Sequence, residues 1–343
     1  MGALGAPPNR RNRADSVTVQ PAELTAVILT RNEERHISRA IRCLESYPGP
    51  VEILVVDSNS TDRTLEIAAA EGATVITHEF VSHARQLNWV LENVPISSPW
   101  VLRLDADEVL YPETLERLHS AIAMAPQEIS GFAFNRRHIF LGHWVKFGGR
   151  YPLWLLRVWR AGSAKAEDRW MDEHIVLNSG RSARVRGRFE DRNISSLDEL
   201  ITKHLRYASL EAMDRLFPTS RDVQFDSLDG VMTRMKRWLK NRVYNSMPLG
   251  SGPVLLFLWR IGPRLGFLDG PSGFAYHMIQ GFWYRTMVEL KLNQMRLIVE
   301  NSRTLESLLQ GLADYTGIPS DRLESKITAQ KLPSSASKPP PQY

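Results

Sequence analysis

The sequence predicts an α/β protein built on a mostly parallel central sheet. Short apolar runs alternate with helical stretches from residue 24 onward, and most of these runs end in polar or acidic residues. Strands that read as continuous apolar runs are typical of parallel sheets covered by helices on both faces. The composition, 43% hydrophobic and 24% charged over 343 residues, is that of a folded globular protein and excludes a collagen-like or wholly disordered chain.

The apolar runs define four expected strands. They are LTAVILT at 24–30, VEILVVD at 51–57, ATVITHE at 73–79 and WVLRLDAD at 100–107. Between the first two, Ile37, Ile41 and Leu44 recur at helical spacing and predict a helix. A further helix is expected at Gln86–Asn93, before the fourth strand.

The helix between the second and third strands has clear expected ends. It runs from Thr61 to Glu71 and is ended by Gly72. Its N-cap is one of three residues with short polar side chains, which accept hydrogen bonds from the free backbone N–H groups of a first turn: Ser60, Thr61 or Asp62.

Polar and acidic residues follow three of the strands, as TRNEE (30–34), DSNSTD (57–62) and DADE (105–108). Because such sheets bind ligands at the carboxyl ends of their strands, we expect these residues to converge on one edge. Asp57 ends a buried strand and would accept hydrogen bonds from a ribose or a base. Asp105 and Asp107 provide two hard oxygen ligands for Mg²⁺ or Mn²⁺, although an isolated Asp-x-Asp is also common on protein surfaces.

Two common phosphate-binding loops are absent from the sequence. No G-x-G-x-x-G follows the first strand, and G-x-x-x-x-G-K-S/T does not occur. Their absence argues against a dinucleotide oxidoreductase and a P-loop NTPase. We therefore expect a metal ion on the aspartates to hold the phosphates of a ligand.

The segments TRNEERHISRAIRCL, VEILVVDSNSTDRTLEIAAAEGA and WVLRLDADE resemble, in order and spacing, the family 2 glycosyltransferases, specifically the bacterial branch that builds lipopolysaccharide cores and exopolysaccharides. The resemblance covers residues 24–215, and residues 266–292 look like the C-terminal extension of one subgroup. It implies a GT-A fold and an inverting hexosyl transfer assisted by Mg²⁺ or Mn²⁺. The implied donor is a nucleoside-diphosphate sugar, in the first place a UDP-sugar.

The resemblance also assigns donor-site residues. Four of them would contact the nucleoside: Thr30, Asn32, Glu33 and Asp57. Asp105 would lie beside the ribose and the metal, and Asp107 would hold the metal on the diphosphate. Gln86 and Asn88 fall where the family often has Gln-Arg-Asn and would also bind the donor, but Leu87 takes the place of the arginine that would contact a phosphate.

An inverting transfer needs a base that removes the proton of the acceptor hydroxyl, a contribution of about 10²–10⁴-fold in rate. The segment RWMDEH at 169–174 resembles the Glu-His element of the family's acceptor half. This resemblance assigns Glu173 as the base and Asp172 as the second candidate. His174 would complete the metal site or pair with the leaving group, and a purely structural histidine is the alternative.

The expected domain organisation follows from these segments. The tails at 1–22 and 331–343 are rich in Pro, Asn, Arg or Ser and are expected to be disordered. The GT-A catalytic domain is expected at 23–225, with a nucleotide-binding half (23–110), an acceptor half (111–225) and then a helical, aromatic-rich, membrane-associating extension (226–330).

The net charge of +5 is concentrated in one segment. Residues 231–300 hold ten Lys or Arg against three acidic residues, a local charge of +7, together with ten of the 30 aromatic residues. Such a segment suits a membrane surface or nucleic acid, or is a solvated basic face over an aromatic core. The resemblance implies a lipid-linked or lipopolysaccharide/exopolysaccharide acceptor. We therefore expect this segment, in which Lys236, Arg237 and Lys240 flank aromatic residues, to contact the membrane that carries the acceptor. No nucleic acid is expected, because no nucleic-acid-binding module is recognised.

Location and alternatives complete the sequence-based prediction. The single Cys43 and the interrupted apolar run at 253–268 favour a cytoplasmic protein on the inner face of the cytoplasmic membrane. One alternative is a nucleotidyltransferase that makes nucleotide sugars, but such enzymes usually carry a Gly-rich loop where this chain has TRNEE. The other alternative is a non-catalytic basic protein that binds membranes or nucleic acid.

Overall fold

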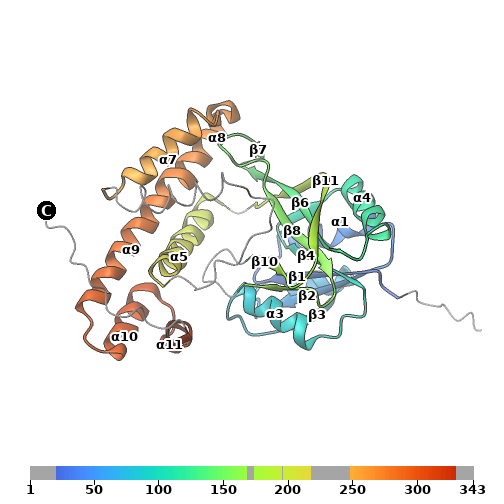
Figure 1. Ribbon diagram of the computed structural model, residues 1–343, viewed down its shortest axis with the longest axis horizontal. Helices are drawn as coiled ribbons and strands as arrows, with labels where there is room; N and C mark the ends of the chain where they lie inside the picture. Colours follow the sequence, from blue (N-terminus) through green and yellow to red (C-terminus); the bar gives the residue numbers. More distant parts are fainter. Residues whose placement is uncertain (1–20, 168–173, 195, 218–247, 330–343) are drawn as a thin grey trace, which may run out of the picture.

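The computed structural model of the protein describes residues 21–167, 174–194, 196–217 and 248–329. The α/β part of the molecule is built around a central sheet, and a helical part lies along one side of the α/β part (Figure 1). The α/β class and the helical C-terminal region are therefore confirmed.

Four parallel strands form the first half of the sheet. They are β1 (Leu24–Thr30), β2 (Val51–Asp57), β3 (Thr74–Thr77) and β4 (Trp100–Asp105). Their order across the sheet is β3-β2-β1-β4. β1 is buried at every position, which explains its unbroken apolar sequence. All four strands occur where the sequence predicts them, with β3 and β4 shorter than expected.

The second half of the sheet mixes parallel and antiparallel pairs, whereas the first half is parallel throughout, as the sequence predicts. Its strands are β5 (Glu108–Leu110), β6 (Ile129–Phe140), β7 (His143–Val145), β8 (Trp154–Arg160) and β11 (Arg181–Asp191). The order continues β4-β8-β6-β11-β5, with β7 paired to β6. β8 is antiparallel to both β4 and β6, whereas β6 and β11 are parallel. The chain passes from β6 to β8 through β7 without a helix, and short connections join antiparallel neighbours.

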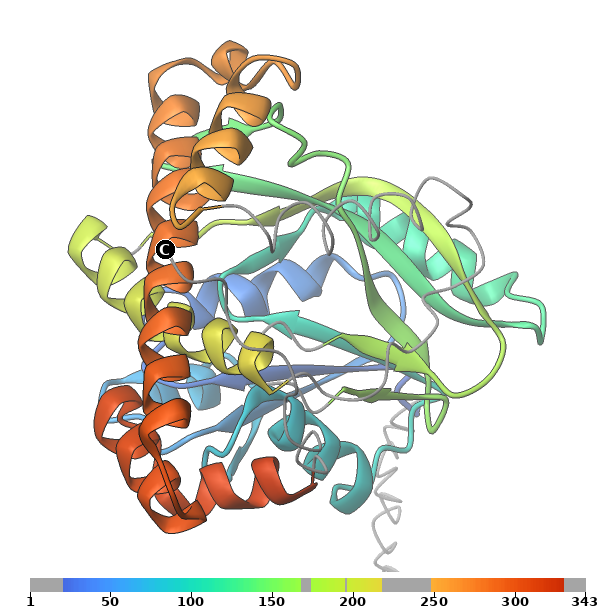
Figure 2. The ribbon, with the colours of Figure 1, turned by 60° about the vertical axis from the view of Figure 1, so that its left-hand side comes forward.

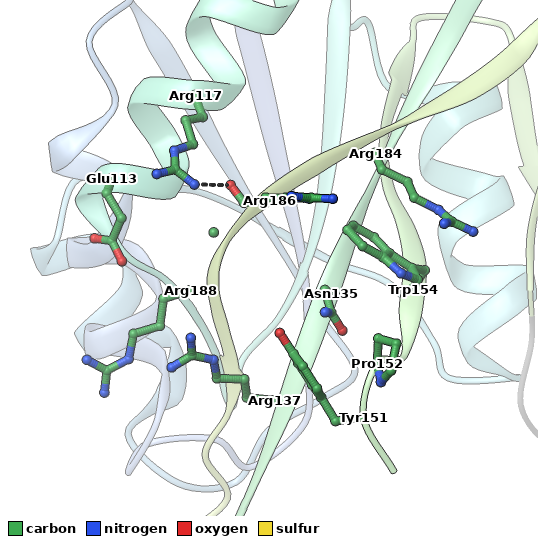
Figure 3. Close-up of a pocket in the computed structure, with 11 residues that line it drawn as sticks. Glu113, Arg117, Asn135, Arg137, Tyr151, Pro152, Trp154, Arg184, Arg186 and Arg188 are labelled. Atoms are coloured by element: carbon green, nitrogen blue, oxygen red, sulfur yellow. Dashed lines mark hydrogen bonds between the residues drawn. The ribbon is translucent and has the colours of Figure 1, made fainter. Parts of the chain in front are cut away.

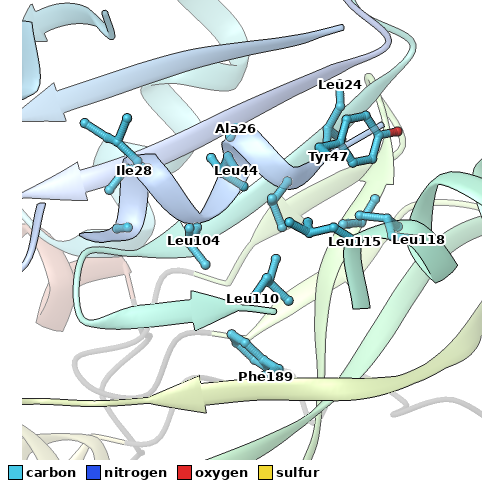
Figure 4. Packing of buried hydrophobic residues seen from close by; sticks show 14 of the residues in the cluster. Leu24, Ala26, Ile28, Leu44, Tyr47, Leu104, Leu110, Leu115, Leu118 and Phe189 are labelled. Atoms are coloured by element: carbon cyan, nitrogen blue, oxygen red, sulfur yellow. The ribbon is translucent and has the colours of Figure 1, made fainter. Parts of the chain in front are cut away.

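Helices and a small second sheet cover the faces of the central sheet, and α4 packs on β11. These elements are α1 (Ile37–Cys43), η1 (Leu44–Ser46), α2 (Thr64–Ala70), α3 (His83–Asn93), α4 (Pro112–Ala123), and the antiparallel pair β9 (Ala164–Ala166) and β10 (Ile175–Leu177). Figure 4 shows the core on the α1 and α4 side, where Ala26 and Ile28 of β1 lie near Leu104 of β4. Leu115 and Leu118 of α4 complete this cluster. α3, β9 and β10 contribute to a separate cluster that contains the alternate residues of β1.

The start of α2 differs from the prediction. The helix begins at Thr64 with Arg63 as its N-cap, so Ser60, Thr61 and Asp62 all lie before it. Asp62 Oδ1 still accepts a hydrogen bond from the Thr64 N–H at 3.0 Å. The other two residues are held elsewhere, because their N–H groups bind side chains at the ends of β1 and β2.

The helical part consists of α5 (Leu197–Leu216), α7 (Ser251–Ile261), η3 (Gly266–Asp269), α8 (Gly270–Tyr276), the π-helix η4 (His277–Trp283), α9 (Tyr284–Asn301), α10 (Leu305–Thr316) and α11 (Ser320–Ala329). α5 and α9 lie side by side (Figures 1 and 2). Met213 of α5 packs with Met295 of α9 and Leu312 of α10 in one buried cluster. α5 thus packs with the extension, although it precedes residue 225. Across the described ranges, no helix is long and apolar enough to span a membrane.

Candidate active site

The register of the parallel strands brings the three polar strand ends together. Thr30 pairs with Asp57, and Leu29 pairs with Asp105. The carboxyl ends of β1, β2 and β4 therefore meet at one edge, which confirms the expected convergence.

Asp57 is fully buried and anchors the loops at this edge. Its carboxylate accepts hydrogen bonds from the Thr30 hydroxyl at 3.0 Å and from the Ser60 N–H at 2.8 Å. Asn32, with a left-handed φ of 56°, accepts a hydrogen bond from the Thr61 N–H at 2.8 Å through its side-chain oxygen. Asparagine is among the residues that tolerate this conformation. These contacts tie the loop after β1 to the loop after β2.

Glu33 and His36 connect this edge to the end of β11. Glu33 Oε2 lies 2.7 Å from His36 Nδ1, and the Ile194 N–H donates to His36 Nε2 at 3.1 Å. Because Nε2 accepts a hydrogen bond, the contacts place the ring proton on Nδ1, facing Glu33. The chain after β11 is thereby fixed against the loop after β1.

Asp105 is held by two arginines. Arg103 Nε lies 3.2 Å from Asp105 Oδ1, and Arg157 Nη2 lies 2.9 Å from Asp105 Oδ2. Burial opposes the charge of Asp105, but Arg103 and Arg157 outweigh it and hold the pKa of this carboxyl well below its usual range. Arg157 also pairs with the fully buried Glu108. Asp105 is therefore ionised, with both oxygens engaged.

Asp107 has the opposite electrostatic environment. Burial and the neighbouring carboxylate of Asp191 raise the pKa of Asp107 to about 6. Asn193 donates to Asp107 Oδ2 at 3.2 Å, and among the described residues nothing donates to Oδ1. Oδ1 of Asp107 is therefore available as a ligand, and the nearby carboxylate of Asp191 adds negative charge. Both features favour the binding of a cation at Asp107.

Two neighbours of Asp107 were missed at the sequence level. Asp191 ends β11, with Oδ2 3.0 Å from His138 Nδ1 and 3.5 Å from Arg136 Nη1. Burial opposes its charge, but these two side chains lower the pKa of Asp191 to about 2. Its signal in the sequence is that of the other site residues, because Asp191 is another acid that ends a strand.

Lys203 of α5 is the other missed residue. Burial opposes its positive charge, but Tyr207, Asp107 and Glu33 outweigh burial and raise the pKa of the ammonium above its usual value. The helical part thus contributes a cation to the edge of the sheet. Nothing in the sequence could place it there, because the contact depends on how α5 packs.

Gln86 and Asn88 are engaged by the protein itself. Gln86 is buried and donates to the Ser58 hydroxyl at 2.6 Å. Asn88 exchanges two hydrogen bonds with the backbone of Ala166, at 2.9 and 2.8 Å. Both side chains therefore fix the framework beside the site, and a direct donor contact from them stays a prediction.

Of the residues expected to bind metal, Asp107 is suited to that role and Asp105 is not. The free oxygen and raised pKa of Asp107 suit a hard divalent cation. Asp105 is occupied by arginines, and in the described part of the chain no three His, Cys, Asp or Glu side chains gather as metal ligands. The expected set of Asp105, Asp107 and His174 is thus not assembled, and a cation on Asp107 would take further ligands from a bound diphosphate or water.

Several predicted residues lie outside the described ranges. These are the two base candidates Asp172 and Glu173, and the basic residues Lys236, Arg237 and Lys240. His174 is described, and its backbone oxygen accepts a hydrogen bond from the Glu167 N–H at 2.9 Å next to β9.

Comparison with known proteins gives a consistent result. Residues 25–185 match the family model of glycosyl transferase family 2. An uncharacterized glycosyltransferase of Rickettsia typhi is 34% identical over 106 residues, which are 31% of this chain and 35% of that protein. The lipopolysaccharide core biosynthesis glycosyltransferase LpsC of Rhizobium meliloti is 26% identical over 259 residues, 74% of this chain and 88% of that protein.

Among solved structures, the mannosyltransferase PcManGT of Pyrobaculum calidifontis, in complex with GDP-Man and Mn²⁺, aligns with a TM-score of 0.44. Its sequence is 14% identical, and the alignment covers 83% of this chain and 89% of that chain.

Proposed function

We propose that this protein, whose residues 25–185 belong to glycosyl transferase family 2, transfers a sugar from a nucleoside-diphosphate sugar to a saccharide acceptor with inversion. One observation carries the proposal: within the matched domain, the ends of β1, β2 and β4 form a single carboxylate-rich edge. Asp57 and the loop of Asn32 lie on the side where a nucleoside would bind. Asp107 lies beyond β1 on the β4 side, where a diphosphate would follow.

The charge pattern of the edge supports a diphosphate leaving group. A divalent cation held by Asp107 would offset the negative charge that builds on the diphosphate as the sugar leaves. Arg157 and Arg103 keep Asp105 ionised, so Asp105 contributes a fixed negative charge beside Asp107. Lys203 limits the repulsion between Asp107 and Glu33.

The proposed base is Glu173, with Asp172 as the second candidate, on the resemblance of RWMDEH to the family's Glu-His element. The base would accept the proton of the acceptor hydroxyl while that oxygen attacks the anomeric carbon from the face opposite the diphosphate. β9 and β10 flank this segment, and Asn88 clamps β9 to α3.

The proposed acceptor is a lipid-linked saccharide, and the proposed location is a membrane surface on the cytoplasmic side. Support comes from large apolar side chains that are exposed on α7, η3 and α8. Leu258 and Phe267 are 55% and 54% exposed, and Trp259 and Phe274 are 54% and 47% exposed. Exposed apolar groups of this size mark interaction surfaces, and the basic character of residues 231–300 fits an anionic bilayer. The name of the Rhizobium relative points to the same class of acceptor.

A donor panel tests the proposed function. Purified protein is incubated with Mn²⁺ or Mg²⁺ and with UDP-, GDP- and dTDP-sugars, with and without membrane extract, and nucleoside diphosphate release is measured. We expect release from one donor class, increased by the extract. Release of pyrophosphate from a sugar phosphate and a nucleoside triphosphate would indicate a nucleotidyltransferase instead. No release under any condition would contradict an enzyme.

A further inference from the structure

A cavity of about 630 Å³ lies away from the edge formed by the ends of β1, β2 and β4. It straddles β11 (Figure 3): α4 contributes Arg117 on one side of this strand, and Tyr151 and Trp154 lie on the other. Five of the lining side chains are arginines: Arg117, Arg137, Arg184, Arg186 and Arg188. Glu113 is the acidic residue among the described residues that line it.

Most of this positive charge is not neutralised by the protein. Arg188 pairs with Glu190 at 2.6 Å. Within the described ranges, the other four arginines form no ion pair with a carboxylate. Two of them lie against aromatic rings instead, with Arg137 4.5 Å from the ring centre of Trp144 and Arg184 5.0 Å from that of Trp154. These contacts orient the guanidinium groups without cancelling their charge.

One donor at the cavity also lacks a partner. Arg137 Nε is buried and has no hydrogen-bond partner among the described residues, although buried donors are normally paired. Guanidinium groups bind phosphate and carboxylate with two parallel hydrogen bonds, so a cluster of arginines selects oxyanions. The cavity therefore has the chemistry of an anion site.

The size and walls of the cavity favour a saccharide over a bare anion. A volume of 630 Å³ falls in the usual range of small-molecule pockets, about 300–1,000 Å³, and is much larger than a phosphate needs. The rings of Tyr151 and Trp154 provide flat apolar surfaces for the face of a sugar ring.

Two strands, β6 and β11, contribute side chains both to the cavity and to the candidate active site. Along β6, Arg136 and His138 contact Asp191 at the catalytic edge, whereas Asn135 and Arg137 line the cavity. Successive residues of a strand point to opposite faces, so β6 builds both sites. β11 likewise carries Arg184 and Arg186 in the cavity and Asp191 at the edge. The nucleotide loops after β1 and β2 contribute no lining residue to the cavity.

We propose that this arginine pocket binds an anionic saccharide, a sugar that carries phosphate or carboxylate groups. The assignment rests on the proposed function, because it makes this sugar part of the acceptor and so narrows the acceptor class to negatively charged glycans. It adds a binding site to the chain that is separate from the donor site.

Direct binding to the full chain tests the pocket. The probes are glucose 6-phosphate against glucose, and digalacturonic acid against its methyl ester, measured by calorimetry at low salt. We expect each anionic probe to bind at least 10-fold more tightly than its neutral partner. The double variant Arg184→Gln/Arg186→Gln should weaken anionic binding at least 10-fold, because each charge-assisted hydrogen bond contributes that order of affinity.

The matched control is Arg181→Gln. Arg181 lies on the same strand, is exposed and contacts Glu128 at 3.8 Å outside the cavity, so anionic binding should stay at the wild-type level. Circular dichroism melts would establish that all variants fold.

Three outcomes would overturn the proposal: neutral probes that bind as tightly as anionic ones, a double variant that binds like the wild type, or competitive displacement of the probe by UDP or GDP. Inorganic phosphate that binds as tightly as glucose 6-phosphate would remove the saccharide part of the assignment. Nucleotide release by the wild type is measured separately. Its absence with all donors would contradict the proposed function, whereas the binding data alone decide whether the pocket takes anions.

Discussion

The carboxylate of Asp269 accepts a hydrogen bond from the backbone N–H of Phe147 at 3.0 Å, across 122 residues of sequence. It also accepts one from the Lys146 N–H at 2.9 Å. Asp269 precedes α8, and Phe147 lies in the loop between β7 and β8. This side chain therefore latches the helical part onto the α/β part.

Replacing Asp269 tests the latch. Asp269→Ala should lower the free energy of unfolding by about 1.5–3 kcal/mol, because it removes charge-assisted hydrogen bonds and leaves two N–H groups without their acceptor. Asp269→Asn, which keeps one acceptor oxygen, should lose less. Urea denaturation measures both, and an unchanged midpoint for Asp269→Ala would show that the latch contributes nothing.

The same junction predicts a dependence of stability on pH. His277 is fully buried, with close contacts to Gly148 and Gly266. Burial lowers the pKa of His277, and Arg260 adds to this effect although Asp269 opposes it. The unfolded chain therefore takes up a proton near pH 6.5, whereas the folded chain does so at lower pH. The stability conferred by the neutral ring is present above pH 6.5 and lost as the pH falls below it.

His277→Gln should reduce this pH dependence. The drop in Tm between pH 8 and pH 5.5 should be smaller for the variant than for the wild type, whatever the variant's Tm at pH 8. His143→Gln, at an exposed position, is the control and should reproduce the wild-type drop. Equal drops in all three proteins would exclude His277 as the group responsible.

Asp107 should couple donor binding to metal. Asp107→Asn removes the negative charge that favours a cation, so Mn²⁺-dependent binding of a nucleoside diphosphate should weaken at least about 10-fold, the effect of losing one charge-assisted contact. Calorimetry with and without Mn²⁺ measures this. Glu116→Gln, an exposed acid on α4, should leave it unchanged. If Asp107→Asn retains full metal-dependent affinity, the cation is held elsewhere.

Glu173 should affect turnover and not donor binding. Glu173→Gln should lower kcat by about 10²–10⁴-fold, the usual contribution of a general base, with nucleotide affinity retained. Asp172→Asn is the matched comparison and should have a much smaller effect. The reverse order of the two variants would assign the base to Asp172.

The apolar surface of α7 and η3 should hold the protein on lipid. The double variant Leu258→Ser/Phe267→Ser should reduce flotation with anionic vesicles at least about 10-fold. Each apolar side chain of this size contributes about 1.5–3 kcal/mol to the free energy of membrane binding when it is buried in lipid. Neutralising Lys236, Arg237 and Lys240 together should act in the same direction and mainly at low salt. Leu305→Ser, exposed on α10, is the control. If neither the apolar double variant nor the basic triple variant changes flotation, residues 231–300 form a solvent-exposed basic face that does not bind membranes.

Local sequence was enough to predict the nucleotide half of the fold. β1 and β2 follow from their apolar runs, and their polar ends follow from the rule that parallel strands align at one edge. Asp57 and Asp107 could be found for the same reason, because Asp57 is the last residue of β2 and Asp107 follows the end of β4 by two residues.

The sequence by itself determined the parallel half-sheet and the carboxylates at its edge, because each depends on a short pattern of neighbouring residues, whereas the C-terminal extension was expected from the family resemblance. The tertiary structure alone decided that Asp191 and Lys203 join Asp107, and that arginines of α4, β6 and β11 share one cavity. These groups are brought together by the mixed pairing of β6, β8 and β11 and by the packing of α5 against α9. Such long-range contacts leave no periodic signal in the chain.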